Sequence, residues 1–148
     1  MIFLTKNIDF LNDIYQNAQM GIIGIDEVLY KVKDDKLKRE LEREKKGFNK
    51  IITKCTKNLK EYKCKPKKIS FMTKMSSEFY SEMKLKSENC DDIILKMMIE
   101  GSYKSVGILT TKLMTNDDLS QVSLDLADKL LEMINSNIEH LKKFDKIC

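Results

Sequence analysis

The sequence is poor in the residues that make tight turns: its 148 residues include one proline and five glycines. It also has no tryptophan and one histidine. A fold of many short strands needs turn residues between them, which this composition does not supply. Lys, Glu, Leu, Ile and Met are abundant instead, and they favour long helices. We therefore expect an all-α protein with a single domain over residues 1–148.

Other absences argue against a membrane-spanning protein and a secreted one. No apolar run approaches the ~18 residues of a transmembrane helix, and the first residues, MIFLTKNIDF, show neither a basic leader nor a cleavage site. The four cysteines show no CxxC spacing, so we expect reduced thiols and a cytoplasmic location. The formal net charge is +4, from 27 basic and 23 acidic residues. This small excess gives no reason to expect nucleic acid as a partner.

Positive charge is concentrated locally in the segment KNLKEYKCKPKK, residues 57–68, which contains six lysines. Such a segment can contact the anionic surface of a nucleic acid or a membrane. It has no arginine to make bidentate contacts with phosphate. The preferred interpretation is a solvated helix end and loop.

Apolar residues recur at helical spacing along four long segments. They extend from about residue 7 to 33, from 37 to 62, from 90 to 114 and from 116 to 144. The only proline, Pro66, follows the second segment and prevents it from continuing as a helix. We expect four long helices, each with one apolar stripe that faces a shared core.

Polar residues before these segments indicate where the helices begin. Asn7 is a candidate N-cap of the first helix, Asp34 or Asp35 of the second, and Thr115 of the last. The few residues between the first two segments predict an antiparallel helical hairpin.

A shorter amphipathic stretch, ISFMTKMSSEFYSEMKLK, separates the two pairs of long segments at residues 69–86. A helix of ~18 residues is ~27 Å long, enough to return the chain from one end of a bundle to the other. The second and third long helices would then run parallel. This is a four-helix bundle with a short helix in its one long crossover, the connectivity of ferritin-like folds. A five-helix up-and-down bundle is the alternative topology.

An iron site in a ferritin-like bundle takes a Glu from each of two helices and a Glu-x-x-His motif from each of the other two. The candidate ligands on the four long segments are Glu27, Glu44, Glu100 and His140. Two positions depart from the motif. Gly47 stands three residues after Glu44, where a histidine is required, and Asn137 stands three before His140, where a glutamate is required.

The chain resembles the ferritin-like superfamily. The resemblance rests on the helix lengths, the acidic turn KVKDDKLKRE, the segment DIILKMMIEGSYKSVGIL and a final amphipathic helix with His140 near its end. More narrowly, the chain is similar to a family of uncharacterised bacterial proteins of about 150 residues that form a four-helix bundle. The resemblance implies the fold, and in typical members it implies iron storage or oxidation at a carboxylate–histidine site.

Two hypotheses of function follow. In the favoured one the protein is a non-enzymatic bundle without a cofactor. It acts through protein–protein contacts or as a homo-oligomer, and Gly21 with Gly24, or Gly101 with Gly107, lets helices approach closely. In the alternative it is a diminished dimetal protein that handles iron or peroxide. The ligands would then be Glu27, Glu44, Glu100 and His140.

Overall fold

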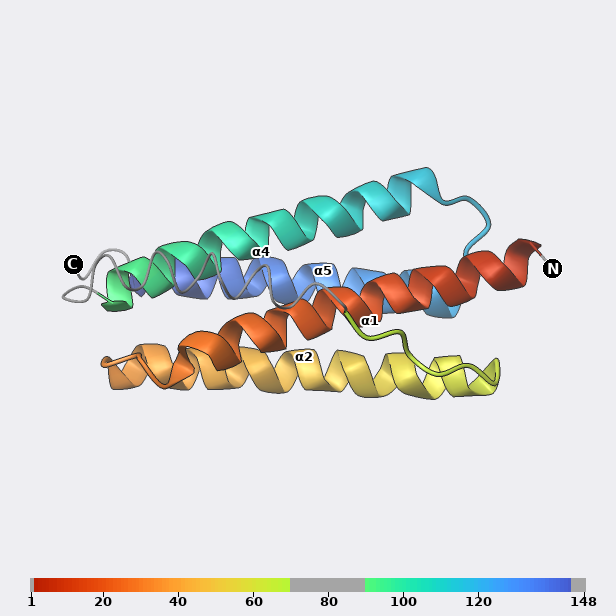
Figure 1. Ribbon diagram of the computed structural model, residues 1–148. Helices are drawn as coiled ribbons and strands as arrows, with labels where there is room; N and C mark the ends of the chain where they lie inside the picture. Colours follow the sequence, from red (N-terminus) through yellow and green to blue (C-terminus); the bar gives the residue numbers. More distant parts are fainter. Residues whose placement is uncertain (1, 70–89, 145–148) are drawn as a thin grey trace.

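The computed structural model describes residues 2–69 and 90–144, and these residues form four α-helices and no strand. The helices are α1 (Ile2–Leu29), α2 (Asp35–Glu61), α4 (Cys90–Thr115) and α5 (Gln121–Lys142) (Figure 1). The all-α class and the four long helices are therefore confirmed. The short helix that we expect at residues 69–86 lies, except for its first residue, outside the described residues.

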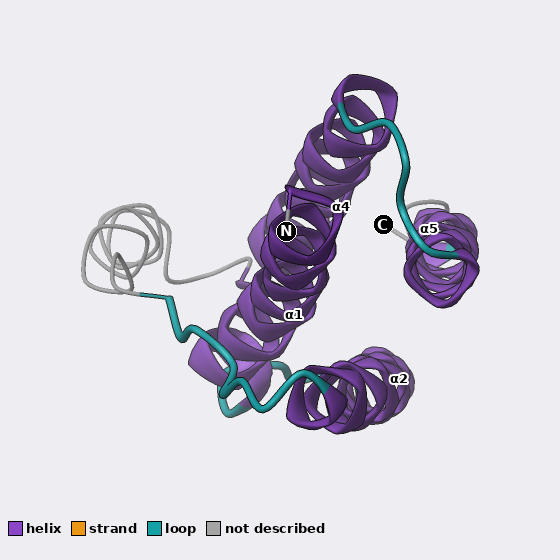
Figure 2. Ribbon diagram, turned by 90° about the vertical axis from the view of Figure 1, so that its right-hand side faces the viewer, coloured by secondary structure: helices purple, strands orange, loops and turns teal. Residues whose placement is uncertain are grey.

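The four helices form two antiparallel hairpins, α1–α2 and α4–α5 (Figure 1). Seen end-on, α1 packs against α2 and α4, and α5 packs against the same two helices (Figure 2). A further contact joins α1 and α5 across the bundle, so α2 and α4 are the pair that lies farther apart. Helices α2 and α4 run in the same direction (Figure 1). Both predicted topologies require these two directions.

The core consists of the apolar stripes that the helical spacing predicts. On α2, Leu37, Leu41, Phe48, Ile51, Cys55 and Leu59 are buried. On α5 the buried apolar residues are Leu126, Ala127, Leu130, Ile134, Ile138 and Leu141. Helix α4 differs, because its apolar residues are spread around the helix. Its buried apolar residues are Ile94, Leu95 and Leu109.

The N-cap of α2 is Asp34, as expected. Its carboxylate accepts hydrogen bonds from the backbone N–H groups of Lys36 and Leu37 at 2.8 and 3.0 Å. The cap of the last helix was predicted wrongly. Thr115 ends α4, and its hydroxyl donates to the carbonyl of Thr111 at 2.9 Å. Ser120 is the N-cap of α5 instead.

The prediction that Asn7 caps the first helix is also wrong, because α1 begins five residues earlier. Asn7 is fully buried and donates to the carbonyl of Phe3 at 2.9 Å. Its Oδ1 accepts hydrogen bonds from the Ser120 N–H at 2.8 Å and from the Ser123 hydroxyl at 3.1 Å. Asn7 thus stabilises the beginning of α5 rather than that of its own helix.

After α2 the chain returns alongside α1, held by three amide side chains. Asn12 Oδ1 accepts from the Lys67 N–H at 2.8 Å, and Gln16 Nε2 donates to the Lys67 carbonyl at 3.0 Å. Gln19 Oε1 accepts from the Ile69 N–H at 3.0 Å. The spacing of four and three residues places these three side chains on one face of α1. They fix the first part of the crossover on that helix.

Candidate functional site

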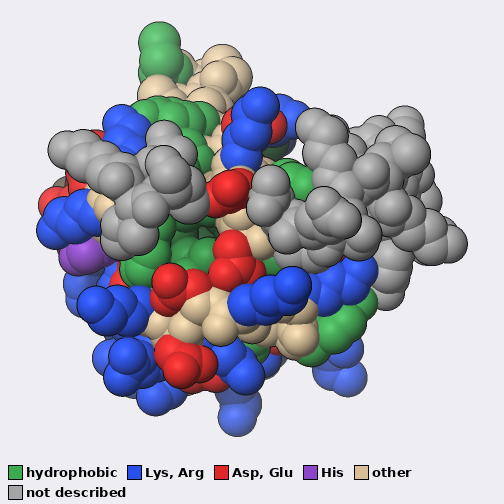
Figure 3. All heavy atoms as spheres, turned by 90° about the vertical axis from the view of Figure 1, so that its left-hand side faces the viewer, with side chains coloured by type: hydrophobic (Ala, Val, Ile, Leu, Met, Phe, Trp, Pro, Cys, Tyr) green, Lys and Arg blue, Asp and Glu red, His purple; other side chains and the backbone are tan. Residues whose placement is uncertain are grey.

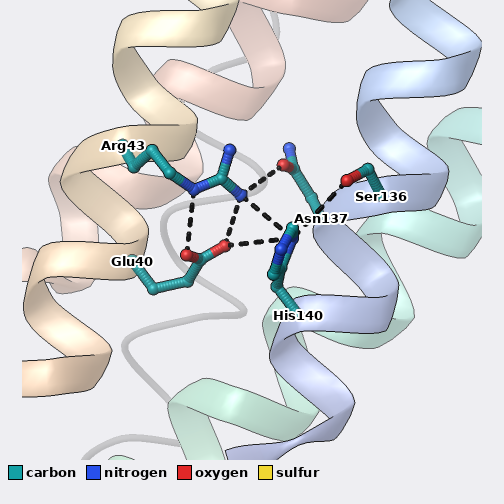
Figure 4. A network of polar contacts seen from close by, with 5 residues as sticks. All are labelled: Glu40, Arg43, Ser136, Asn137 and His140. Carbon is teal, nitrogen blue, oxygen red and sulfur yellow. Dashed lines mark hydrogen bonds and ion pairs between the residues drawn. The ribbon is translucent and has the colours of Figure 1, made fainter.

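A cluster of polar side chains lies where α2 packs against α5 (Figure 4). Glu40, Arg43 and Glu44 come from α2, and Ser136, Asn137 and His140 come from α5. Residues three and four apart share a helix face, so each helix presents its three polar groups to the other. Because Glu44 and Asn137 are buried, the cluster is the main candidate for a functional site among the described residues.

Arg43 lies at the centre of this cluster. Its guanidinium makes a two-pronged contact with the Glu40 carboxylate, through Nη2 at 2.5 Å and Nε at 3.0 Å. The same Nη2 also donates to Asn137 Oδ1 at 3.1 Å and lies 3.3 Å from His140 Nδ1. One nitrogen is therefore shared by a carboxylate, an amide oxygen and an imidazole nitrogen from two helices.

Glu44 holds a proton in this environment. Burial raises the pKa of its carboxyl group to about 9, and a hydrogen bond to Glu40 and the charge of Glu40 act in the same direction. Burial also acts to raise the pKa of Glu40, but hydrogen bonds from Arg43 and Glu44 lower it overall. At neutral pH the pair therefore consists of a neutral Glu44 that donates and an ionised Glu40 that accepts.

His140 is half-buried and turns Nδ1 towards the cluster. Nδ1 lies 3.3 Å from Arg43 Nη2, 3.5 Å from the Ser136 hydroxyl and 3.9 Å from Glu40 Oε1. An arginine N–H can only donate, so the contact with Arg43 is a hydrogen bond only when Nδ1 is the acceptor. The 3.9 Å contact between Nδ1 and Glu40 Oε1 is an ion pair only when the imidazole is protonated. Nδ1 of His140 therefore lies among a guanidinium, a hydroxyl group and a carboxylate.

The four residues predicted as metal ligands do not share one place. Glu44 and His140 both lie at the α2–α5 interface, whereas Glu27 is half-buried on α1. Glu100 is exposed on α4, which lies across the bundle from α2. Among residues 2–69 and 90–144, no group of three or more His, Cys, Asp and Glu side chains is arranged to hold a metal ion. A ligand role for these four residues stays a prediction.

The cluster itself does not fit a dimetal centre. Glu40, Asn137 and His140 all lie with an acceptor atom close to Arg43 Nη2, so a metal ion bound by these atoms would have to displace the positively charged guanidinium. Glu44 has an oxygen, Oε2, without a hydrogen-bond partner among the described residues. That carboxyl group carries a proton that it would have to lose before binding a cation.

Gly47 stands where the Glu-x-x-His motif requires a histidine, and the packing of the two helices gives a steric reason for glycine there. A Cβ atom at this position would lie 2.7 Å from the sulfur of Met133, which packs there from α5. Glycine therefore allows α2 and α5 to approach closely. A histidine in its place would have to push Met133 aside.

Sequence reasoning missed Glu40 and Arg43, the two residues at the centre of the cluster. Neither lies on the apolar stripe of α2, where ligands were sought. One signal was available: only two of the 27 basic residues are arginines, Arg39 and Arg43. Arginine is the residue that matches a carboxylate with two parallel hydrogen bonds.

The lysine-rich segment 57–68 covers the end of α2 and the beginning of the return along α1. The backbone of Lys67 is held by α1, while all six lysines are exposed. At the opposite end of the bundle, Lys and Arg side chains also gather, with acidic side chains among them (Figure 3). Among the residues that the structure describes, positive and negative side chains are therefore mixed at that end.

Comparison with protein-family models, curated proteins and solved structures finds no match to this chain. Within the described residues, no helix is both long and apolar enough to cross a membrane.

Proposed function

We propose that the protein is a non-enzymatic helical bundle that acts through protein–protein contacts, with self-association as the first of them. The observation that carries the proposal is the outer surface of α4. Tyr103, Ile108 and Met114 are large side chains whose exposed fractions are 50, 49 and 78%. Apolar side chains grouped on one helix are a feature of interaction surfaces.

The glycines support α4 as the contact helix. A Cβ on Gly21 would lie 2.6 Å from the ring of Phe48, and one on Gly24 would lie 3.6 Å from Met98. This pair therefore serves packing within the chain. By contrast, nothing among the described residues lies within 4 Å of a Cβ built on Gly101 or Gly107. Another backbone can approach α4 there.

Charge on the same helix supports a second copy of the chain as the partner. Lys96, Glu100 and Lys104 are exposed and follow one another at steps of four residues, along one side of α4. When two copies of α4 run antiparallel about a two-fold axis, Glu100 of each copy can lie opposite Lys104 of the other. One helix face thus supplies both partners of two ion pairs.

The molar mass in solution tests self-association. We expect sedimentation velocity over a range of concentrations to show a monomer–dimer equilibrium. A double variant, Ile108→Asp with Met114→Asp, should shift it to monomer because both charges would be buried at the contact. Tyr30→Asp is the matched control, since Tyr30 is 65% exposed on the α1–α2 turn. A wild-type protein that stays monomeric at every concentration would refute the proposal.

A charge exchange tests the pairing of the two copies. Glu100→Lys alone should raise the dimer dissociation constant about tenfold, because two attractive pairs become repulsive. Lys104→Glu alone should have the same effect. The double variant with both changes should restore the wild-type constant. An unchanged constant in all three would leave self-association standing but reject this register.

We also propose that the bundle is ferritin-like and that the protein is cytoplasmic. The two antiparallel hairpins with parallel α2 and α4 support the first. The free thiols of Cys55 and Cys64 support the second.

The alternative function is diminished iron binding, and the unpartnered Glu44 Oε2 is the observation in its favour. Metal analysis of protein purified without chelator tests it. Stoichiometric iron that is lost in Glu44→Ala would support it, whereas no binding under anaerobic iron loading would exclude it.

A further inference from the structure

We infer that the α2–α5 cluster is a binding site for a guanidinium cation, which Arg43 supplies from within the chain and which free guanidinium can supply in its absence. The inference is independent of self-association. It concerns the groups that surround Arg43, and it explains why this interface contains polar side chains between two apolar stripes.

The first argument is geometric. Acceptors on Glu40, Asn137 and His140 converge on one nitrogen of the guanidinium, while Glu40 also receives the neighbouring Nε. The groups come from two helices, so the cation joins α2 to α5. Nη2 has two N–H groups to share among these three acceptors, while Nε–H binds the second oxygen of Glu40, so the planar ion contacts all of them from one position. The single ammonium of a lysine cannot form the two-pronged contact.

The orientation of Asn137 provides a second argument. Its side chain is 1% exposed, and it turns Oδ1 to Arg43 although Nδ2 then has no hydrogen-bond partner among the described residues. The reverse orientation would place an N–H group against the guanidinium. The buried amide therefore leaves its own donor unsatisfied in order to present an acceptor to the cation.

The charge of the cluster matches a monovalent cation. Glu40 contributes one negative charge, while the protonated Glu44 contributes none. One guanidinium balances this charge, whereas a divalent metal ion would leave an excess positive charge at a partly buried interface. The composition agrees: the chain uses lysine for 25 of its 27 basic residues, yet places one of its two arginines here.

Chemical rescue tests the site. Arg43→Ala should unfold at a lower temperature than wild type, and guanidinium chloride at low millimolar concentration should raise its melting temperature in a saturable way. At ten times the dissociation constant the folded-to-unfolded ratio should rise about tenfold. Sodium chloride and methylammonium chloride should have no such effect, since neither cation forms the planar fork.

Arg39→Ala is the matched control, because Arg39 lies on the same helix and is exposed like Arg43, but it is not part of the cluster. Guanidinium should not stabilise that variant or the wild type. If it acts on all three proteins alike, the inference is wrong. If zinc or ferrous ion stabilises Arg43→Ala and guanidinium does not, the site is selective for a divalent metal and the inference is again overturned.

A measurement on the wild-type protein does not depend on how well a variant folds. With only two arginines, the nitrogen-15 NMR spectrum has two Nε–H signals to assign. Arg43 should show slow Nε–H exchange with solvent and separate Nη signals, because its guanidinium is held from both helices. Arg39 should show averaged signals. Averaged signals for both arginines would contradict the inference.

Discussion

Glu44 shows how one residue can make stability depend on pH. The residue is 3% exposed, and the pKa of its carboxyl group is raised from 4.5 to about 9 in the folded protein. Between these values the folded state holds a proton that the unfolded state has lost. Stability must therefore fall as the pH rises through this range, by up to about 1.4 kcal/mol per pH unit.

We predict that Glu44→Gln removes this alkaline loss, because the amide is neutral at every pH and can still donate to Glu40. Urea unfolding from pH 5 to 9 measures it: wild type should lose stability with rising pH, and the variant should stay nearly level. The exposed Glu42→Gln is the control for removing a carboxylate from α2. A wild-type curve that rises towards pH 9 would contradict the assigned protonation.

Asn7 illustrates a residue whose role depends on a distant part of the chain. We predict that Asn7→Ala destabilises the protein by about 2 kcal/mol, because Ser120 and Ser123 each lose a buried hydrogen bond. Hydrogen exchange should accelerate first at the beginning of α5. Asn49→Ala, at an exposed position on α2, should leave both the stability and the exchange unchanged.

These residues also show what the sequence could and could not reveal. Asp34 was one of two predicted caps, beside Asp35, and could be found because its partners, Lys36 and Leu37, are its neighbours along the chain. Asn7 was predicted wrongly because its partner Ser120 is 113 residues away. Arg43 was missed for the same reason, since two of its acceptors come from α5. Local signals are visible in a single sequence, but contacts between helices require the packing.

Among the helices, α2 and α4 differ in how much they depend on the rest of the bundle. The apolar residues of α2 form one stripe, which is buried, so its position was clear from helical periodicity. The apolar residues of α4 surround the helix, and several remain exposed. Periodicity therefore predicted the existence of α4 but not which of its faces enters the core.

The amide side chains on α1 bind the backbone of the segment that follows α2, at Lys67 and Ile69. Removing them should destabilise that segment first. We predict that Gln16→Ala with Gln19→Ala destabilises the protein by about 1–2 kcal/mol, because two hydrogen bonds to the backbone are removed. The amide of Ile69 should then exchange faster, since Gln19 is its acceptor. Gln121→Ala, which removes an exposed contact with Asp125 on α5, is the control. Equal exchange at Ile69 in all three proteins would rule out this anchoring.

For the molecule as a whole, Cys55 can report on global opening. Its thiol is fully buried, and burial raises its pKa to about 12. We predict that a variant keeping Cys55 alone reacts with a disulfide reagent about a hundredfold more slowly than one keeping the half-buried Cys64 alone. Denaturant should accelerate the Cys55 reaction up to the rate of unfolding. Comparable rates for the two variants without denaturant would show that the core opens locally.

The contact between Asn7 and Ser120 also sets an order of events during synthesis. Asn7 leaves the ribosome more than a hundred residues before its partner, and domains acquire structure as the chain emerges. The α1–α2 hairpin can therefore form early. At that stage the Asn7 amide and the apolar stripes of the two helices have not yet met the second hairpin, which later covers them. A chain that stalls before Ser120 presents this unfinished surface to chaperones, and completion of α5 removes it.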